Sequence, residues 1–123
     1  MNYVSTRGAA APASLSEALA FGLAGDGGLF VPEDFPPPFA RLPPPRSLPD
    51  VANWLLKPFF EGDALEGDLA GICDEALYLN APTVETRDPA LFVLELFHGP
   101  TLAFKDFGAR FLAAALAAPR MFD

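Results

Sequence analysis

Residues 91–118, which read LFVLELFHGPTLAFKDFGARFLAAALAA, indicate the fold class. Residues 91–97 are apolar at both alternating positions except for Glu95, a pattern typical of a strand covered on both faces in a parallel α/β sheet. The sequence His98-Gly99-Pro100-Thr101 interrupts this run. A helix is predicted from about residues 102–104 to Ala118, because apolar side chains then recur at helical spacing. The segment therefore predicts a strand, a loop and a helix of an α/β fold that needs more sheet than this chain supplies.

A helical wheel sorts the side chains of the predicted helix into two faces. One apolar stripe holds Phe104, Phe107, Phe111 and Ala115. Asp106 and Arg110 lie on the opposite side, four positions apart, where a solvated ion pair is expected.

Lys105 falls at the edge of the apolar stripe, in the first turn of this helix. A cation is disfavoured near a helix N-terminus, and partial burial among Leu and Phe disfavours it further. Both effects favour the neutral amine, which is the form that attacks an aldehyde. On the wheel alone, the favoured interpretation of Lys105 is a lysine that extends its ammonium group to solvent. The other lysine of the chain is Lys57.

The N-terminal part predicts two short strands around a helix. Residues 2–6 and 29–31 are rich in β-branched and aromatic types, as strands are. Ser14-Leu15-Ser16-Glu17 is a capping-box pattern, with Ser14 as the N-cap, and the helix is expected to end near Gly22.

Two more helices are predicted in the middle of the chain, over residues 48–60 and 66–79. Pro58 is expected to end or kink the first of them. In the second, Cys73 falls on the apolar face and is interpreted as a small buried residue rather than a reactive thiol. Residues 36–49 contain seven of the 14 prolines and are predicted to be exposed and without regular secondary structure.

Composition excludes several classes of function. The formal net charge of −8, with no block of basic residues, argues against a nucleic-acid or anionic-membrane surface. One cysteine allows no intramolecular disulfide, and with a single histidine it matches no known metal-binding spacing. No secretory signal and no apolar run of about 20 residues is present, so we expect a soluble, cytoplasmic protein without a metal.

Three segments resemble threonine synthases. Residues 95–110, ELFHGPTLAFKDFGAR, are similar to the segment of that family that carries the lysine for pyridoxal 5′-phosphate (PLP). Residues 3–8, YVSTRG, resemble the opening of the family, and residues 26–32, DGGLFVP, resemble its next shared stretch. A short Phe-Lys-Asp alone would be weak evidence of membership. The long segment with two companions in the same order is specific, and the resemblance spans nearly the whole chain.

The resemblance implies the fold type II α/β architecture of PLP enzymes, which is like that of the tryptophan synthase β subunit and is incomplete in this chain. It implies a PLP-dependent carbon–oxygen lyase that converts O-phospho-L-homoserine and water to L-threonine and phosphate. Lys105 is then the catalytic and cofactor-binding residue, which holds PLP as a Schiff base and moves protons during phosphate elimination. The oligomeric state is not implied.

Other motif residues keep open roles. His98 is expected to shape the loop or to hydrogen-bond rather than to act as a base, and Thr101 to cap the helix through its hydroxyl or to touch the cofactor. Glu95 needs a partner on a buried strand, for which Arg7 and Arg110 are candidates. A contact of Arg7 with the substrate phosphate is the less favoured alternative.

The chain is expected to comprise a mixed, mainly helical region over residues 1–88 and the truncated start of a PLP-binding domain over residues 89–123. It has no glycine-rich cradle for the cofactor phosphate, because Gly25, Gly27 and Gly28 match a turn. We therefore expect the chain alone to be inactive. The alternatives are a threonine-synthase-like phospholyase with another substrate, and a non-catalytic folding or interaction module.

Overall fold

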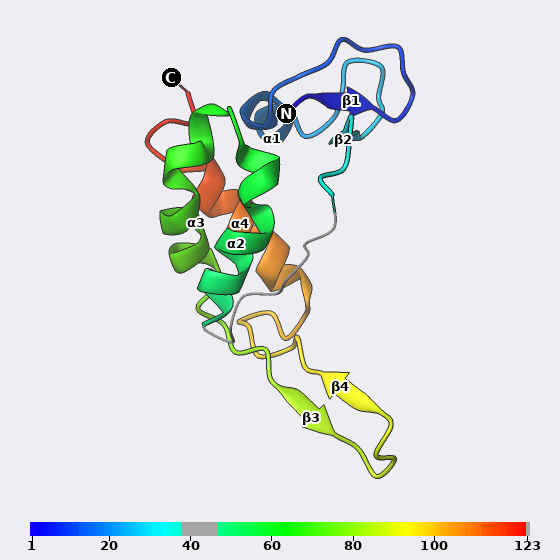
Figure 1. Ribbon diagram of the computed structural model, residues 1–123, viewed down its shortest axis with the longest axis vertical. Coiled ribbons are helices and arrows are strands. Elements are labelled where there is room, and N and C mark those ends of the chain that lie inside the picture. Colours follow the sequence, from blue (N-terminus) through cyan, green and yellow to red (C-terminus); the bar gives the residue numbers. More distant parts are fainter. Residues whose placement is uncertain (38–46, 123) are drawn as a thin grey trace.

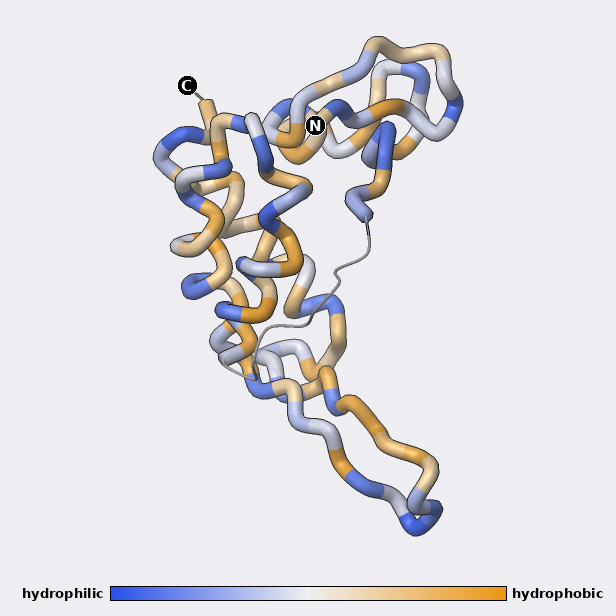
Figure 2. The backbone as a smooth tube through the Cα atoms, viewed as in Figure 1, coloured by the Kyte–Doolittle hydropathy of each residue, from blue (hydrophilic) through white to orange (hydrophobic). Residues whose placement is uncertain are grey.

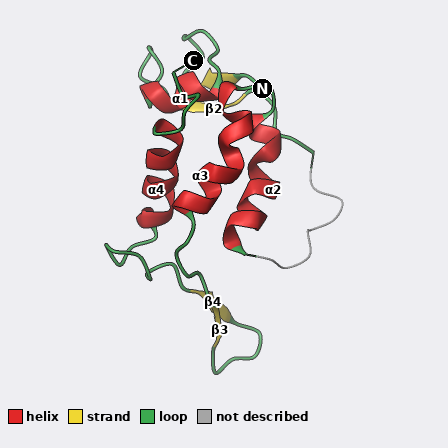
Figure 3. Ribbon diagram, turned by 90° about the vertical axis from the view of Figure 1, so that its left-hand side faces the viewer, coloured by secondary structure: helices red, strands yellow, loops and turns green. Residues whose placement is uncertain are grey.

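The computed structural model describes residues 1–37 and 47–122. Three helices, α2 (Leu48–Phe60), α3 (Leu69–Ala76) and α4 (Lys105–Leu116), form its body, and Figure 3 shows α3 between α2 and α4. At one end lie α1 (Leu15–Phe21) and a sheet of β1 (Tyr3–Ser5) and β2 (Phe30–Pro32). At the other end a hairpin of β3 (Thr83–Glu85) and β4 (Phe92–Leu94) projects from the body (Figure 1).

The apolar face of α3 is the centre of the core. Leu69, Ile72, Cys73 and Ala76 are all buried, as their helical spacing predicts. Ala115 of α4 is fully buried in the same cluster, and Phe60 of α2 meets Phe111 of α4 edge to face at 6.3 Å between ring centroids. Burial raises the pKa of the Cys73 thiol to about 11, and the charge of Asp74 adds to this effect. The interpretation of Cys73 as a buried apolar residue is confirmed.

The predicted capping box of α1 is present. The Glu17 amide donates to Ser14 Oγ at 3.2 Å, and the Ser14 amide donates to Glu17 Oε2 at 2.8 Å. Helix α1 ends at Phe21 with Gly22 as its C-cap, as predicted. The Ser16 amide also donates to Asp63 Oδ2 at 3.1 Å, which ties α1 to the N-cap of the element that follows α2.

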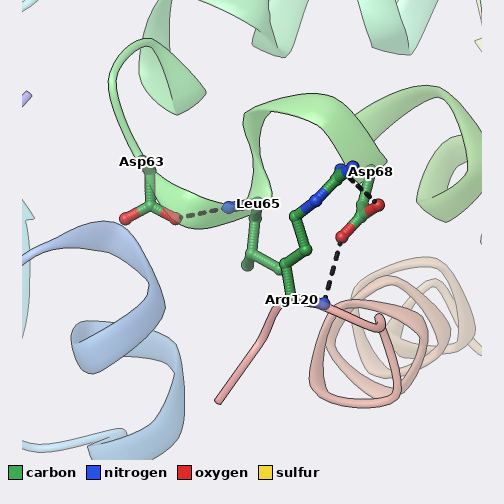
Figure 4. A network of polar contacts seen from close by, with 4 residues as sticks. All are labelled: Asp63, Leu65, Asp68 and Arg120. Atoms are coloured by element: carbon green, nitrogen blue, oxygen red, sulfur yellow. Dashed lines mark hydrogen bonds and ion pairs between the residues drawn. The ribbon is translucent and has the colours of Figure 1, made fainter. Parts of the chain in front are cut away.

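That element is a 3₁₀ helix, η1 (Ala64–Asp68), which occupies the first part of the helix predicted over residues 66–79. Asp63 caps it by accepting from the Leu65 amide at 3.0 Å, and Asp68 accepts from Arg120 Nη1 at 3.0 Å (Figure 4). The predicted bounds of a single helix over residues 66–79 are therefore wrong at both ends. The α-helix proper begins at Leu69 and ends at Ala76.

Proline behaves differently from the prediction in α2. Pro49 lies in the first turn of the helix, where its missing N–H leaves no intrahelical bond unmade. Pro58 lies inside the helix, which continues to Phe60, so the expectation that it ends the regular helix is wrong. Pro36 and Pro37 lie outside regular structure, and residues 38–46 lie outside the described residues.

The apolar run at residues 91–97 is the largest departure from the prediction. Only Phe92–Leu94 forms a strand, and it pairs antiparallel with β3 in the register Val84↔Val93. Its residues are exposed on both faces, between 44% and 56%, and Figure 2 shows this apolar strand away from the helices. The expected parallel, doubly covered strand is therefore not what this chain forms. β3 lies in the region predicted over residues 1–88 and β4 in the region predicted over residues 89–123, so the hairpin links the two. The division into these two regions stays a prediction.

Among the described residues no helix is both long enough and apolar enough to cross a bilayer. This finding agrees with the absence of a long apolar run in the sequence.

Asp26 organises the loops beside β1 and β2. Its Oδ1 accepts from Ser5 Oγ at 2.6 Å and from the Gly28 amide at 2.9 Å, and its Oδ2 accepts from the amides of Ala9 and Ala10. The hydrogen bonds from Ser5 and then Gly28 are the main causes that lower the Asp26 pKa to about 2. A Cβ at Gly28 would overlap Ser5 Oγ, so this position requires glycine.

Leu65→Ala tests the core. Leu65 is 0% exposed, so the change removes buried methyl groups and leaves a cavity, and we expect the free energy of unfolding to fall by about 2–5 kcal/mol. Urea unfolding followed by circular dichroism measures it. Leu55→Ala, at a position that is 37% exposed, is the matched control and is expected to cost distinctly less. Equal losses would contradict the assigned core.

Asp26→Asn tests the loop carboxylate. Folding lowers the Asp26 pKa from 3.8 to about 2, so the ionised carboxylate stabilises the fold above about pH 4 and loses that effect as the pH falls toward 2. The variant is expected to melt at a lower temperature than the unchanged chain at pH 7, and the difference should narrow between pH 4 and pH 2. Thermal unfolding measures this, with the exposed Asp34→Asn as control. A difference independent of pH would contradict the account.

Candidate functional site

The segment between β4 and α4 turns sharply before the helix begins. The Leu102 amide donates to the Gly99 carbonyl at 3.1 Å, and Leu102 has a φ of 56°, a left-handed conformation that a leucine seldom adopts. Helix α4 then starts at Lys105, with Phe104 as an N-cap whose side chain offers no capping hydrogen bond. The predicted helix is confirmed, although it ends at Leu116 rather than Ala118.

Asp106 closes this turn from inside the helix. Its Oδ2 accepts from the Thr101 amide at 2.9 Å and its Oδ1 accepts from Thr101 Oγ1 at 2.7 Å. Asp106 is only 6% exposed. The expectation that it forms a solvated ion pair with Arg110 is therefore wrong, and the hydroxyl of Thr101 donates to a carboxylate instead of capping the helix.

Arg110 binds elsewhere. Its Nε donates to the Ala76 carbonyl at 3.3 Å, and its guanidinium lies over the Tyr78 ring at 4.2 Å from the centroid. These contacts hold α4 against the end of α3. Arg7, the other arginine considered as a partner for Glu95, donates to the Asp26 carbonyl at 3.1 Å.

Glu95 finds its partner within the motif. Its Oε2 lies 2.7 Å from His98 Nε2, and the His98 ring lies against Phe97 with centroids 4.8 Å apart. The two arginine candidates for Glu95 are wrong, because Glu95 lies just after the end of β4, where solvent reaches its side chain. The hydrogen-bonding role expected of His98 is confirmed.

Lys105 is exposed in this chain, so the partial burial inferred from the wheel is wrong. The apolar stripe itself is present farther along: Phe107 and Phe111 pack on the core, whereas Phe104 is 66% exposed. Within residues 1–37 and 47–122, Asp68 pairs with Arg120 and Glu95 contacts His98, and the amine of Lys105 makes no hydrogen bond or ion pair. A free, accessible primary amine fits covalent attachment of an aldehyde cofactor.

Other kinds of site find less support among the described residues. They contain no group of three His, Cys, Asp or Glu side chains placed to hold a metal ion. The cysteine is buried and its raised pKa disfavours the nucleophilic thiolate. Lys105 and the turn before it therefore form the candidate site.

Sequence reasoning missed Asp106 and Gly99. A Cβ built on Gly99 would overlap the Asp106 carboxylate, so glycine is needed for the carboxylate to approach the turn. The spacing from Thr101 to Asp106 exceeds that of an ordinary capping box, which is why the pattern did not reveal the contact.

Comparison with known proteins identifies the family of this chain. Residues 2–77 match the family model described as "Threonine synthase N terminus". The chain belongs to the threonine synthase family. It is 37% identical to the threonine synthase of Pseudomonas aeruginosa and 34% identical to that of Escherichia coli K12. The matches cover 94% and 84% of this chain but only 26% and 24% of those relatives, so the chain spans about a quarter of their length.

Solved structures of the threonine synthase family show the same fold. A PLP-bound threonine synthase from Brucella melitensis superposes with a TM-score of 0.84 at 43% identity, and the match covers 95% of this chain and 28% of that chain. The Escherichia coli enzyme gives a TM-score of 0.76 at 30% identity with the same coverage. The mixed α/β fold expected for the N-terminal part of a fold type II PLP enzyme is thereby confirmed.

Proposed function

We propose that this chain supplies the lysine-bearing N-terminal part of a threonine synthase. The enzyme is a PLP-dependent carbon–oxygen lyase that converts O-phospho-L-homoserine and water to L-threonine and phosphate. Membership of the family supports the activity. The observation that carries the residue assignment is the exposed amine of Lys105 in the first turn of α4, which has no hydrogen-bond or ion-pair partner among the described residues.

Lys105 is proposed to hold the cofactor through Nζ and afterwards to accept and return protons at that atom. The bound PLP ring supplies the electron sink for breaking the bond between carbon and the phosphate oxygen. The turn before α4 is closed by the hydrogen bonds between Thr101 and Asp106, and it holds the backbone of Lys105 in position. Glu95 and His98 hold the loop on the other side of Gly99.

The proposed partner of the enzyme is a small-molecule substrate. The net charge of −8 disfavours a nucleic-acid or anionic-membrane partner. A cytoplasmic location is proposed as well, on membership of the family. A related phospholyase with another phosphorylated amino acid is the second candidate, because it would use the same lysine. Comparing phosphate release from several substrates by the whole enzyme distinguishes the two.

Reductive trapping tests the lysine. The chain is incubated with PLP, reduced with borohydride and mapped by peptide mass spectrometry. Lys105 lies in the first turn of α4 and Lys57 in the last turn of α2, so the helix dipole attracts the anionic phosphate of PLP at Lys105 and repels it at Lys57. With about 0.3–1 kcal/mol at each site, Lys105 is expected to react roughly 3- to 30-fold faster.

Lys105→Ala should remove the preferred adduct, and Lys57→Ala should leave it in place. Both residues are exposed and both lie on helices, so the two variants are matched. A cofactor adduct on Lys57 without one on Lys105 would overturn the assignment.

The chain by itself is expected to release no phosphate from O-phospho-L-homoserine and to bind PLP weakly. An adduct on an exposed lysine stays open to water and hydrolyses, whereas retention needs walls that exclude water. A phosphate-release assay on purified residues 1–123 measures this. Sustained turnover that Lys105→Ala abolishes would show that these residues suffice for catalysis.

A further inference from the structure

The first turn of α4 is anchored by a side chain that lies within it. Phe104, the N-cap residue, provides no side-chain acceptor for the free amides at the helix start. Instead the buried carboxylate of Asp106 accepts two hydrogen bonds from Thr101, five residues earlier. The helix start and the preceding turn are therefore held together by one carboxylate.

The turn is built around that carboxylate. Gly99 leaves room for Asp106, since a Cβ there would overlap the side chain at three atoms. Leu102 takes a left-handed φ of 56°, which costs conformational energy that the surrounding contacts must offset. Removing the carboxylate would therefore release both the turn and the first helical residues.

Lys105 precedes Asp106 directly and is the first residue of α4. Its side chain makes no contact of its own that would hold it within the described residues, so its position depends on the backbone to which it is attached. We propose that Asp106 is a positioning residue for Lys105, which acts by closing the Gly99–Thr101 turn through its two bonds to Thr101. This inference rests on the proposed function of Lys105.

A positioning role and a simple charge effect predict opposite results. If Asp106 acted only as a neighbouring negative charge, it would repel the anionic PLP, and its removal would speed the reaction of Lys105 with the cofactor. If Asp106 holds the first turn, its removal lets that turn fray, and Lys105 loses the helix-dipole environment that attracts the anionic PLP. The reaction of Lys105 then slows relative to Lys57.

The experiment measures the ratio of PLP adducts on Lys105 and Lys57 after borohydride reduction of the full 123-residue chain. The test variant is Asp106→Asn, and its control is Asp74→Asn, the same change at an exposed helical position. The ratio is expected to fall about 2- to 5-fold toward unity in Asp106→Asn, because only the effect at α4 is lost, and to stay unchanged in Asp74→Asn.

A second pair displaces the carboxylate without changing any charge. Gly99→Ala places a methyl group against Asp106, whereas Gly71→Ala adds one where nothing lies within 4 Å. Gly99→Ala should lower the adduct ratio as Asp106→Asn does, and Gly71→Ala should not. In every variant the Cys73 thiol must stay protected from a thiol reagent, which shows that the core is folded.

Rescue by a conservative change completes the test. Thr101→Val removes the hydroxyl that donates to Asp106 and should lower the ratio, and Thr101→Ser keeps the hydroxyl and should retain it. Amide exchange of Thr101 reports whether the turn has opened.

An unchanged or higher ratio in Asp106→Asn, with the turn opened and Cys73 still protected, would overturn the positioning role. Adducts on Lys57 alone in the unchanged chain would instead overturn the proposed function.

Discussion

The structure depends on the burial of one apolar face of α3, because both larger helices pack on it. α3 is only eight residues long, yet it lies between α2 and α4 and supplies four buried side chains. A helix this short is not stable in water by itself, so its order comes from the packing. Since α4 carries Lys105, the place of the candidate site in the molecule follows from this packing.

Much of the helical structure could be predicted from local patterns. The capping box placed α1 correctly because Ser14 and Glu17, three positions apart, bond to each other, and the spacing of apolar residues placed α2 and the buried face of α3. The position of Lys105 in the first turn of α4 followed in the same way. These are interactions between residues at most a few positions apart, so the sequence displays them directly.

The predictions that were wrong depended on contacts between residues far apart in the sequence or on burial. Residues 91–97 have the composition of a covered strand, but among residues 1–37 and 47–122 β4 pairs only with β3, whose three residues gave no clear pattern. Asp106 was assigned to a solvated face because a helical wheel does not include the turn that folds back on it. Asp26, Asp63 and Asp106 each accept from backbone amides of a neighbouring loop or helix start, and carboxylates used in this way are not visible as charge pairs.

The pairing of β3 with β4 has a consequence for the order in which the chain folds. The register joins Glu85 to Phe92, a short separation, whereas the bonds of Ser16 to Asp63 close a loop of 47 residues. Closing a short loop costs less chain entropy and takes less time than closing a long one. The hairpin can thus form while the helices are still separate, and the link between α1 and η1 belongs to the late steps. The most apolar strand of the chain is then hydrogen-bonded along one edge before the core exists.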